Sequence, residues 1–195
     1  MKIILASKSP RRKDILRELG ISFEIHTADT DETCCETCPQ RLVQILAERK
    51  GEEVYKNIKN DDALIISADT VVSCGGKILG KPKSADDAKA MLRLLSGKKH
   101  TVTSGLSLKY NGKTVTGCDN TDVYFAELSD EFIEKYVASG VPMDKAGAYA
   151  VQGIASMWIE RLDGCYFNVV GLPVRLLCRL LLQLGIDPCE ISSNL

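Results

Sequence analysis

The chain has 195 residues, of which 26% are charged and 45% hydrophobic, and its formal net charge is −1. This composition is typical of a globular protein and gives no overall attraction to nucleic acid or to an anionic membrane. No apolar run approaches the roughly 20 residues of a membrane-spanning helix, and the apolar run near Met1 is too short for a signal peptide. We therefore expect a cytoplasmic protein that binds neither nucleic acid nor membrane.

The first predicted elements are a short strand at residues 3–5 and a helix that begins at Ser9 and Pro10. Serine is a favourable N-cap, and proline suits the first helical position. Arg11 and Arg12 crowd the first turn, where the helix dipole favours an anion over a cation. A bound polyanion would resolve this conflict, because hydroxyl, backbone N–H and guanidinium groups could converge on phosphate oxygens. The alternative is a solvated basic helix start.

A second strand and a second helix are predicted next. Apolar residues alternate with polar ones at 23–27, which is typical of a half-buried strand, and an acidic, turn-rich stretch follows at 29–32. A capping-box pattern at 37–40 starts the helix, and its apolar periodicity ends near Gly51.

One carboxylate interrupts a buried strand. Residues 63–66 are apolar and continue to 72, with Asp69 inside the run. Burying an unpaired carboxylate costs several kcal/mol, so Asp69 requires a cation, a metal or a water-filled cleft beside it. Ligands in α/β sheets bind beyond the carboxyl ends of strands, which is where we expect Asp69. The alternative is an aspartate that caps a turn.

The remaining elements mix hairpins and helices. They are a hairpin turn at 75–76, a short loop with Lys81, a helix from Ser84 to Gly97, a strand at 102–108, a turn at 111–112, strands from 115 and at 123–128, a helix at 129–140, a hairpin of 157–162 with 165–170, and a leucine-striped helix at 176–184. We interpret the leucine stripe as core packing, with a dimer interface as the alternative. The pattern predicts a mixed twisted sheet flanked by helices.

Eight cysteines are present, but their spacing is irregular. Cys34, Cys35 and Cys38 include one C-x-x-C, and a structural zinc site usually needs a second such pair. Without secretion, disulfides are not expected. We interpret the cysteines as reduced thiols that pack as small hydrophobes, with metal binding or oxidation at residues 34–38 as the alternative.

Several side chains suit a metal-bound polyphosphate. The candidate anion binders are Ser7, Arg11, Arg12, Lys50 and Lys81, and the candidate carboxylates are Asp31, Glu32 and Asp69. Carboxylates hold a hard cation such as Mg²⁺ while phosphates supply its other ligands. No Walker A loop, dinucleotide-binding glycine motif or nucleophile elbow is present. Spacing alone therefore indicates a phosphate-handling α/β protein.

Several sequence blocks, taken in order, make the chain resemble the Maf family. They are Leu5-Ala6-Ser7-x-Ser9-Pro10-Arg11-Arg12, Ala68-Asp69-Thr70, Gly80-Lys81-Pro82, the block from Asp144 to Gly153, and Gly171-Leu172-Pro173. The resemblance implies a single Maf-like domain over 1–195, a fold similar to inosine triphosphatase with two lobes around a cleft, and a homodimer. It also implies a nucleoside triphosphate pyrophosphatase that uses Mg²⁺ or Mn²⁺ and cuts between the α- and β-phosphates.

By position, the resemblance makes Asp69 the general base and places a metal on Glu32 and Asp69. Ser7, Arg11, Arg12, Lys50 and Lys81 would contact the phosphates, and Gln152 would face the nucleotide. Arg11-Arg12 with Gln152-Gly153 is similar to the branch that acts on dTTP and UTP. The branch that acts on 7-methyl-GTP carries a tryptophan near position 11 and a glutamate near position 152, and this chain has neither.

Three alternatives stay open at this point. The chain could be a nucleotide-binding regulator of septum formation whose turnover is incidental, or a 7-methyl-GTP-type pyrophosphatase. Asp69 could hold the metal without acting as a base. The family often has two glutamates where this chain has Asp31-Glu32, so the shorter Asp31 has an uncertain share in metal binding, and Gly51 could loosen the helix end after Lys50.

Overall fold

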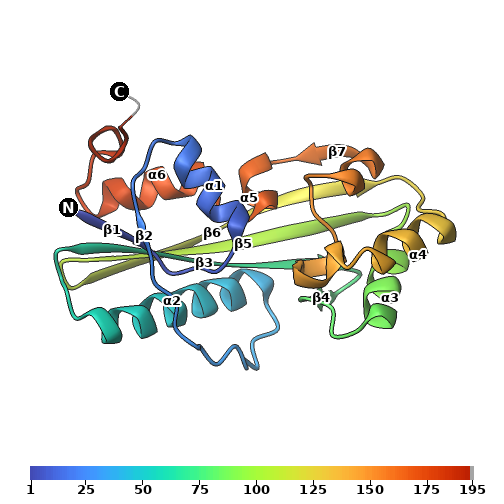
Figure 1. Cartoon of the computed structure of the whole chain (residues 1–195), viewed down its shortest axis with the longest axis horizontal. Helices are drawn as coiled ribbons and strands as arrows, with labels where there is room; N and C mark the ends of the chain where they lie inside the picture. The colour runs from blue at the N-terminus through green and yellow to red at the C-terminus, as the bar shows by residue number, and fades with distance from the viewer. Residues whose placement is uncertain (194–195) are drawn as a thin grey trace. The chain divides into compact units, whose positions relative to one another are not determined.

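Strands and helices alternate early in the chain, and strands pair as hairpins later (Figure 1). The computed structural model describes residues 1–193. The strands are β1 (Lys2–Leu5), β2 (Glu24–Ile25), β3 (Ala63–Cys74), β4 (Lys77–Leu79), β5 (Lys99–Tyr110), β6 (Lys113–Phe125) and β7 (Ile159–Asp163). The helices are α1 (Pro10–Glu18), α2 (Pro39–Ile58), α3 (Ala85–Leu95), α4 (Asp130–Ala138), α5 (Tyr166–Val170) and α6 (Val174–Gln183).

Within residues 1–193, the strands form one seven-stranded sheet in the order β2-β1-β3-β5-β6-β7, with β4 paired to β3. The pairs β1–β2 and β1–β3 are parallel, whereas β3–β4 and β6–β7 are antiparallel. The predicted mixed sheet with flanking helices is therefore confirmed.

The contacts divide the chain into two compact units. The first unit holds residues 1–69, residues 104–119 and the described residues from 171 on, and the second holds residues 70–103 and 120–170. Strands β3, β5 and β6 each contribute residues to both units. The single Maf-like domain over 1–195 stays a prediction.

In the first unit, helices cover both faces of the strands (Figure 1). A Cβ at Gly105 of β5 would meet the Val43 carbonyl oxygen of α2 at 2.4 Å, so the α2 backbone lies directly against this strand. A Cβ at Gly117 of β6 would meet Leu176 of α6 at 2.9 Å. The leucine stripe of α6 is buried at Leu176, Leu177, Leu180 and Leu181, as expected for core packing.

The second unit has its own hydrophobic core, which includes Val72 of β3, Leu92 of α3, Phe125 of β6 and Ile133 of α4. Helix α3 begins as predicted, because the Ser84 side chain accepts a hydrogen bond from the Asp87 N–H. These elements position the loop with Lys81 and the turns between α4 and β7.

The predicted end of α2 at Gly51 is wrong, because the helix continues to Ile58. Gly51 is buried, and a Cβ there would lie 2.7 Å from the Ser67 hydroxyl oxygen. Glycine therefore serves close packing at this position. The predicted helix start is displaced too, because Cys38 is the N-cap residue and no side chain caps the helix.

The last predicted hairpin is also wrong. Residues 166–170 form helix α5 and not a strand. Asn168 is fully buried and donates hydrogen bonds to the Val102 carbonyl oxygen and to the Thr121 hydroxyl oxygen. These long-range contacts outweigh the strand propensity of the segment. The strands predicted from 115 and at 123–128 form one continuous β6, and β2 is shorter and more exposed than predicted.

All eight cysteines are free thiols, as expected, but their environments differ. Cys74 is buried, and Cys35 and Cys189 are exposed, so packing as small hydrophobes describes only part of the set. In the described part of the chain, no helix is long and apolar enough to cross a membrane.

Candidate active site

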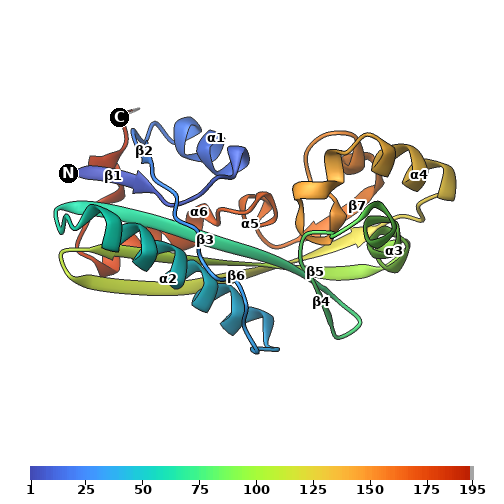
Figure 2. The same cartoon turned by 60° about the horizontal axis from the view of Figure 1, so that its bottom comes forward.

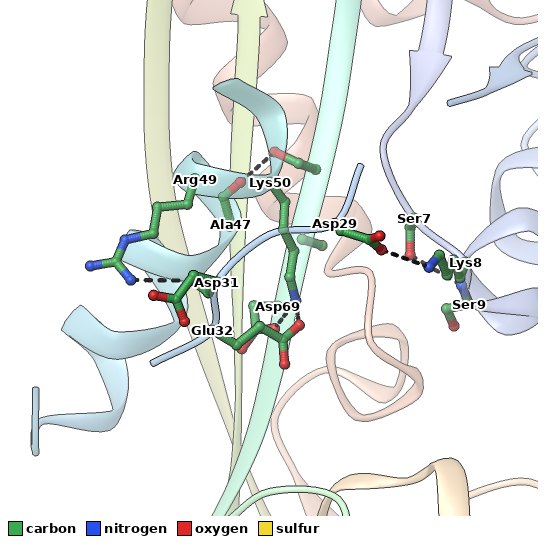
Figure 3. A network of polar contacts seen from close by, with 12 residues as sticks. Ser7, Lys8, Ser9, Asp29, Asp31, Glu32, Ala47, Arg49, Lys50 and Asp69 are labelled. Atoms are coloured by element: carbon green, nitrogen blue, oxygen red, sulfur yellow. Dashed lines mark hydrogen bonds and ion pairs between the residues drawn. The ribbon is translucent and has the colours of Figure 1, made fainter. Parts of the chain in front are cut away.

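A lysine and two carboxylates form the centre of the candidate site (Figure 3). Lys50 comes from α2, Asp69 from β3, and Glu32 from the loop before α2. The Lys50 ammonium donates a hydrogen bond of 2.6 Å to Asp69 Oδ1 and lies 2.7 Å from Glu32 Oε1. The buried Asp69 therefore has the cation that the sequence required beside it.

Close packing of α2 against β3 brings Lys50 to Asp69 (Figure 2). The Ser67 hydroxyl donates to the Ala47 carbonyl oxygen of α2 at 2.7 Å. Residue 51 has no side chain to hold the helix away from Ser67. Ser67 and Asp69 are two residues apart on a strand, so both side chains point to the face that α2 covers.

Asp69 does not lie at the carboxyl end of its own strand, contrary to the expectation, because β3 continues to Cys74. The parallel neighbour β1 ends at Leu5, which pairs with Ile66. Asp69 therefore lies three residues beyond the last β1–β3 pair, and the carboxyl end that it follows is that of β1.

The loop that carries Glu32 is held to α2 by Arg49 (Figure 3). The Arg49 guanidinium donates to the carbonyl oxygens of Asp31 and Thr33, at 3.4 and 2.9 Å. The Asp31 carboxylate accepts a hydrogen bond from the Thr33 N–H at 2.8 Å, which lowers the pKa of Asp31. Asp31 therefore stabilises its own loop, whereas the Glu32 side chain faces Lys50.

Arg12 connects three separate segments of the first unit. Its Nε donates to the Gly171 carbonyl oxygen at 2.8 Å, and its Nη1 donates to the Ala68 carbonyl oxygen at 2.8 Å and to Ser7 Oγ at 3.1 Å. Ser7 Oγ also accepts from the Ser9 N–H at 3.2 Å. Because both lone pairs of this hydroxyl are engaged, the O–H of Ser7 is left as a donor.

The carbonyl oxygens of Gly171 and Ala68 are partners of Arg12 that its sequence position does not predict. Its guanidinium bonds to two carbonyl oxygens and to Ser7 Oγ, so a bound polyanion is not needed to explain its place in the first turn. Burial lowers the pKa of Arg12, whereas the charges of Asp69 and Glu32 act in the opposite direction. Arg11 contributes a further positive charge close to Arg12.

The structure brings Ser7, Arg12, Glu32, Lys50 and Asp69 together within the first unit. Lys81 and Gln152 are exposed residues of the second unit. Their loops are connected there, because the N–H of Gly147 donates to the carbonyl oxygen of Gly80 at 3.0 Å. Gly147 has φ of 68°, and a Cβ there would meet Val72 at 2.9 Å, so this turn requires glycine.

Comparison with known proteins places this arrangement in a family. Residues 2–184 match the family model described as Maf-like protein. The chain belongs to the Maf-like family. Two curated relatives, the dTTP/UTP pyrophosphatases of Bacillus cereus (strain B4264) and Clostridium perfringens (strain SM101 / Type A), are each 46% identical to it over 187 and 185 residues. These alignments cover 95% and 93% of this chain and 97% and 96% of the relatives.

The fold is similar to that of a solved structure as well. The Staphylococcus aureus Ham1 protein superimposes with a TM-score of 0.53 and 13% sequence identity, covering 94% of this chain and 99% of that one. At this level of identity the likeness concerns the fold alone, and it confirms the predicted α/β class for this Maf-like protein.

Three positions that shape the Maf-like site were not among the predicted site residues. Gly171 and Ala68 belong to the sequence motifs without a predicted role of their own, and their carbonyl oxygens accept hydrogen bonds from Arg12. Arg49 was not identified at all, although it holds the Glu32 loop. Its only sequence signal is its position beside Lys50 on a predicted helix, which does not distinguish it from any exposed arginine.

Proposed function

We propose that this Maf-like protein hydrolyses dTTP and UTP to the nucleoside monophosphate and pyrophosphate. The observation that carries the proposal is the cluster of Lys50 with Asp69 and Glu32 in a chain 46% identical, over 95% of its length, to curated dTTP/UTP pyrophosphatases. A buried carboxylate beside cationic groups is suited to activate water next to a polyphosphate.

In the proposed mechanism, Asp69 accepts a proton from the water that attacks the α-phosphorus. The bond from the α-phosphorus to the oxygen that bridges to the β-phosphate then breaks, and pyrophosphate leaves with the electron pair. Negative charge builds up on the leaving group, so cationic groups close to it lower the barrier. Lys50, Arg11 and Arg12 are the cations that the first unit supplies.

Ser7 contributes a hydrogen-bond donor to the phosphates. Its lone pairs are held by the Arg12 guanidinium and the Ser9 N–H, so the hydroxyl can donate to a phosphate oxygen but is a poor acceptor. Arg12 has a double role in this proposal, because the same guanidinium fixes Ser7, Ala68 and Gly171 relative to one another. Lys81 and Gln152 are proposed to contact phosphate and nucleoside, on the family resemblance alone.

The residues present fit a divalent metal. Glu32 and Asp69 both direct a carboxylate oxygen at one ammonium, and hard oxygen ligands are those that Mg²⁺ and Mn²⁺ prefer. Among residues 1–193, no group of three or more His, Cys, Asp or Glu could hold a metal ion. We therefore propose that Glu32 and Asp69 hold the metal and that phosphate and water oxygens complete its shell. When bound, the cation would neutralise charge on the phosphates.

The homodimer and the single domain rest on the family resemblance, and the cytoplasmic location rests on the composition of the sequence. We propose that the protein acts as a cytoplasmic homodimer and that residues 1–195 fold as a single Maf-like domain. Sedimentation at several concentrations tests the dimer. One cooperative unfolding transition that coincides for fluorescence and circular dichroism would support the single domain, and two separate transitions would contradict it.

The experiment for the reaction is pyrophosphate release from dTTP, UTP, CTP, ITP and 7-methyl-GTP with Mg²⁺ or Mn²⁺, with Asp69→Asn as the inactive control. Release from dTTP and UTP that the variant lacks is the expected result. Release from 7-methyl-GTP alone would support the proposed reaction but contradict the proposed specificity for dTTP and UTP. Nucleotide binding without any release would contradict the proposal and favour a nucleotide-binding regulator.

A further inference from the structure

The Lys50 ammonium takes the place that a metal ion would need. It lies 2.6 Å from Asp69 Oδ1 and 2.7 Å from Glu32 Oε1, so the two carboxylate oxygens are within two hydrogen-bond lengths of each other. The Lys50 side chain is 19% exposed and the Asp69 side chain 12% exposed, whereas Glu32 is 57% exposed. The pair of Lys50 with Asp69 is therefore the sheltered part of the cluster (Figure 3).

Local charge is balanced without any metal. Two carboxylates, Glu32 and Asp69, are matched by two cations, Lys50 and Arg12, and the charges of both carboxylates act on Arg12. A free divalent cation approaching Glu32 and Asp69 finds both carboxylates already paired with the Lys50 ammonium. It would also be placed beside an ammonium in a partly buried setting, where repulsion is screened less than in water.

Packing holds the backbone that carries Lys50, whereas only the two carboxylates hold its ammonium. Ser67 and Gly51 hold α2 against β3, so the Cα of Lys50 keeps its place. Beyond it, the flexible four-carbon stem of lysine can swing the ammonium to a new partner, and lysine binds phosphate well as a point charge. A triphosphate would supply such a partner and would also supply ligands to a metal on the two carboxylates.

We propose that Lys50 is an internal counter-ion that keeps Glu32 and Asp69 from binding a divalent cation until a nucleoside triphosphate arrives. The ammonium then moves to the phosphates, and the metal takes its place on the carboxylates. Metal binding to the two carboxylates thus depends on the nucleotide. This inference rests on the proposed function, and it adds an order of binding that neither the sequence motifs nor the relatives' names specify.

The test measures Mn²⁺ binding in the absence of nucleotide. Bound Mn²⁺ is detected as a loss of the free Mn²⁺ signal in electron paramagnetic resonance. Lys50→Met is expected to bind Mn²⁺ at least about tenfold more tightly than the wild type, because the competing charge is gone. Lys50→Arg keeps the charge and should bind as weakly as the wild type. Asp69→Asn added to Lys50→Met should abolish the gain, which places the metal on the carboxylates.

Lys109→Met is the matched control. Lys109 also pairs with a glutamate, Glu52, at 2.8 Å, and its side chain is 16% exposed. Its removal changes the net charge equally but leaves Glu32 and Asp69 paired, so Mn²⁺ affinity should stay that of the wild type. Circular dichroism checks that each variant is folded.

A second measurement uses α,β-methylene dTTP, which cannot be cleaved at the α–β bridge. In the wild type, calorimetry should show that Mn²⁺ tightens binding of this analogue at least about tenfold, and the gain should shrink in Lys50→Met. Equal Mn²⁺ affinity of wild type and Lys50→Met without nucleotide would overturn the inference. The Mn²⁺ titrations need no turnover, so their failure is distinct from a failure to release pyrophosphate.

Discussion

Each unit contains a sheltered polar pair: an ion pair in the first unit and a hydrogen bond between two aromatic side chains in the second. In the first unit, Lys50 and Asp69 form an ion pair at 2.6 Å. In the second unit, His100 Nε2 lies 2.7 Å from the Tyr149 hydroxyl, and both rings pack edge-on against Phe125. Burial lowers the pKa of His100 to about 4 and raises that of Tyr149, so this pair is neutral at neutral pH.

The difference separates a structural site from a chemical one. A buried polar atom is least costly when it is uncharged and hydrogen-bonded, as His100 Nε2 and the Tyr149 hydroxyl are. Replacing a buried ion pair by apolar residues often leaves stability unchanged or improves it, so such a pair is weak evidence for a role in stability. Lys50 and Asp69 instead form an ion pair with Glu32 beside it, in the unit where the candidate site residues gather.

The largest expected effect is that of Asp69→Asn. We expect kcat to fall by about 10²–10⁴-fold, the usual contribution of a general base, while Glu32, which stays 2.7 Å from the Lys50 ammonium, limits the loss of stability. Asp122→Asn is the matched variant in the second unit, where Lys99 and Thr101 donate to the carboxylate and lower its pKa. It should lose stability and keep kcat. Pyrophosphate release and urea unfolding of both variants measure this, and the reverse pattern would contradict the comparison.

The second prediction concerns pH and His100. The unfolded histidine titrates near 6.5 and the folded one near 4, so between these values only the unfolded chain binds the proton. The free energy of unfolding therefore falls as the pH drops from 6.5 towards 4, by about 3 kcal/mol at the acid end. Urea unfolding of wild type and His100→Gln at pH 7 and pH 4.5 isolates this contribution. An identical loss in both proteins would show that His100 does not stay neutral.

The third prediction tests how α2 is held beside Asp69. A Cβ at residue 51 would lie 2.7 Å from Ser67 Oγ and 3.5 Å from Ser67 Cβ, so the clash is with the hydroxyl. Gly51→Ala should cost about 1–3 kcal/mol of stability through overpacking, and it should lower kcat because Lys50 is displaced. In the Ser67→Ala background the same substitution should cost much less.

A double-mutant cycle on stability and on kcat measures this coupling between residues 51 and 67. The analogous Gly75→Ala change, in the β3–β4 turn of the second unit, supplies a reference for backbone strain without a clash, since nothing lies within 4 Å of a Cβ there. If the effects of the Gly51 and Ser67 changes on stability and on kcat were additive, the proposal that this contact holds α2 beside Asp69 would be contradicted.

Local signals predicted much of the fold. Ser9-Pro10 started α1, Asn111-Gly112 turned β5 into β6, and the apolar run at 63–72 gave most of β3. The errors arose where distant residues decide. Gly51 looked like a helix stop because its partner, Ser67, is on another element. Residues 166–170 looked like a strand because the acceptors of Asn168 are far away in sequence.

In the candidate site, too, some features leave a local signal in the sequence and others depend on contacts between distant residues. A carboxylate inside a buried strand predicts a cation beside Asp69, and the residues alone already place Lys50 among the candidate anion binders without naming it as that cation. The connection of Arg12 to Gly171 spans 159 residues and leaves no local pattern. The functional roles of all the candidate site residues stay predictions, because they depend on a bound nucleotide and metal.

The measurement that tests the central claim most directly is hydrolysis of dTTP in ¹⁸O-labelled water with mass analysis of both products. Attack of water on the α-phosphorus predicts one labelled oxygen in the thymidine monophosphate and none in the pyrophosphate. Label in the pyrophosphate, or in free phosphate, would place the attack on another phosphorus and contradict the account.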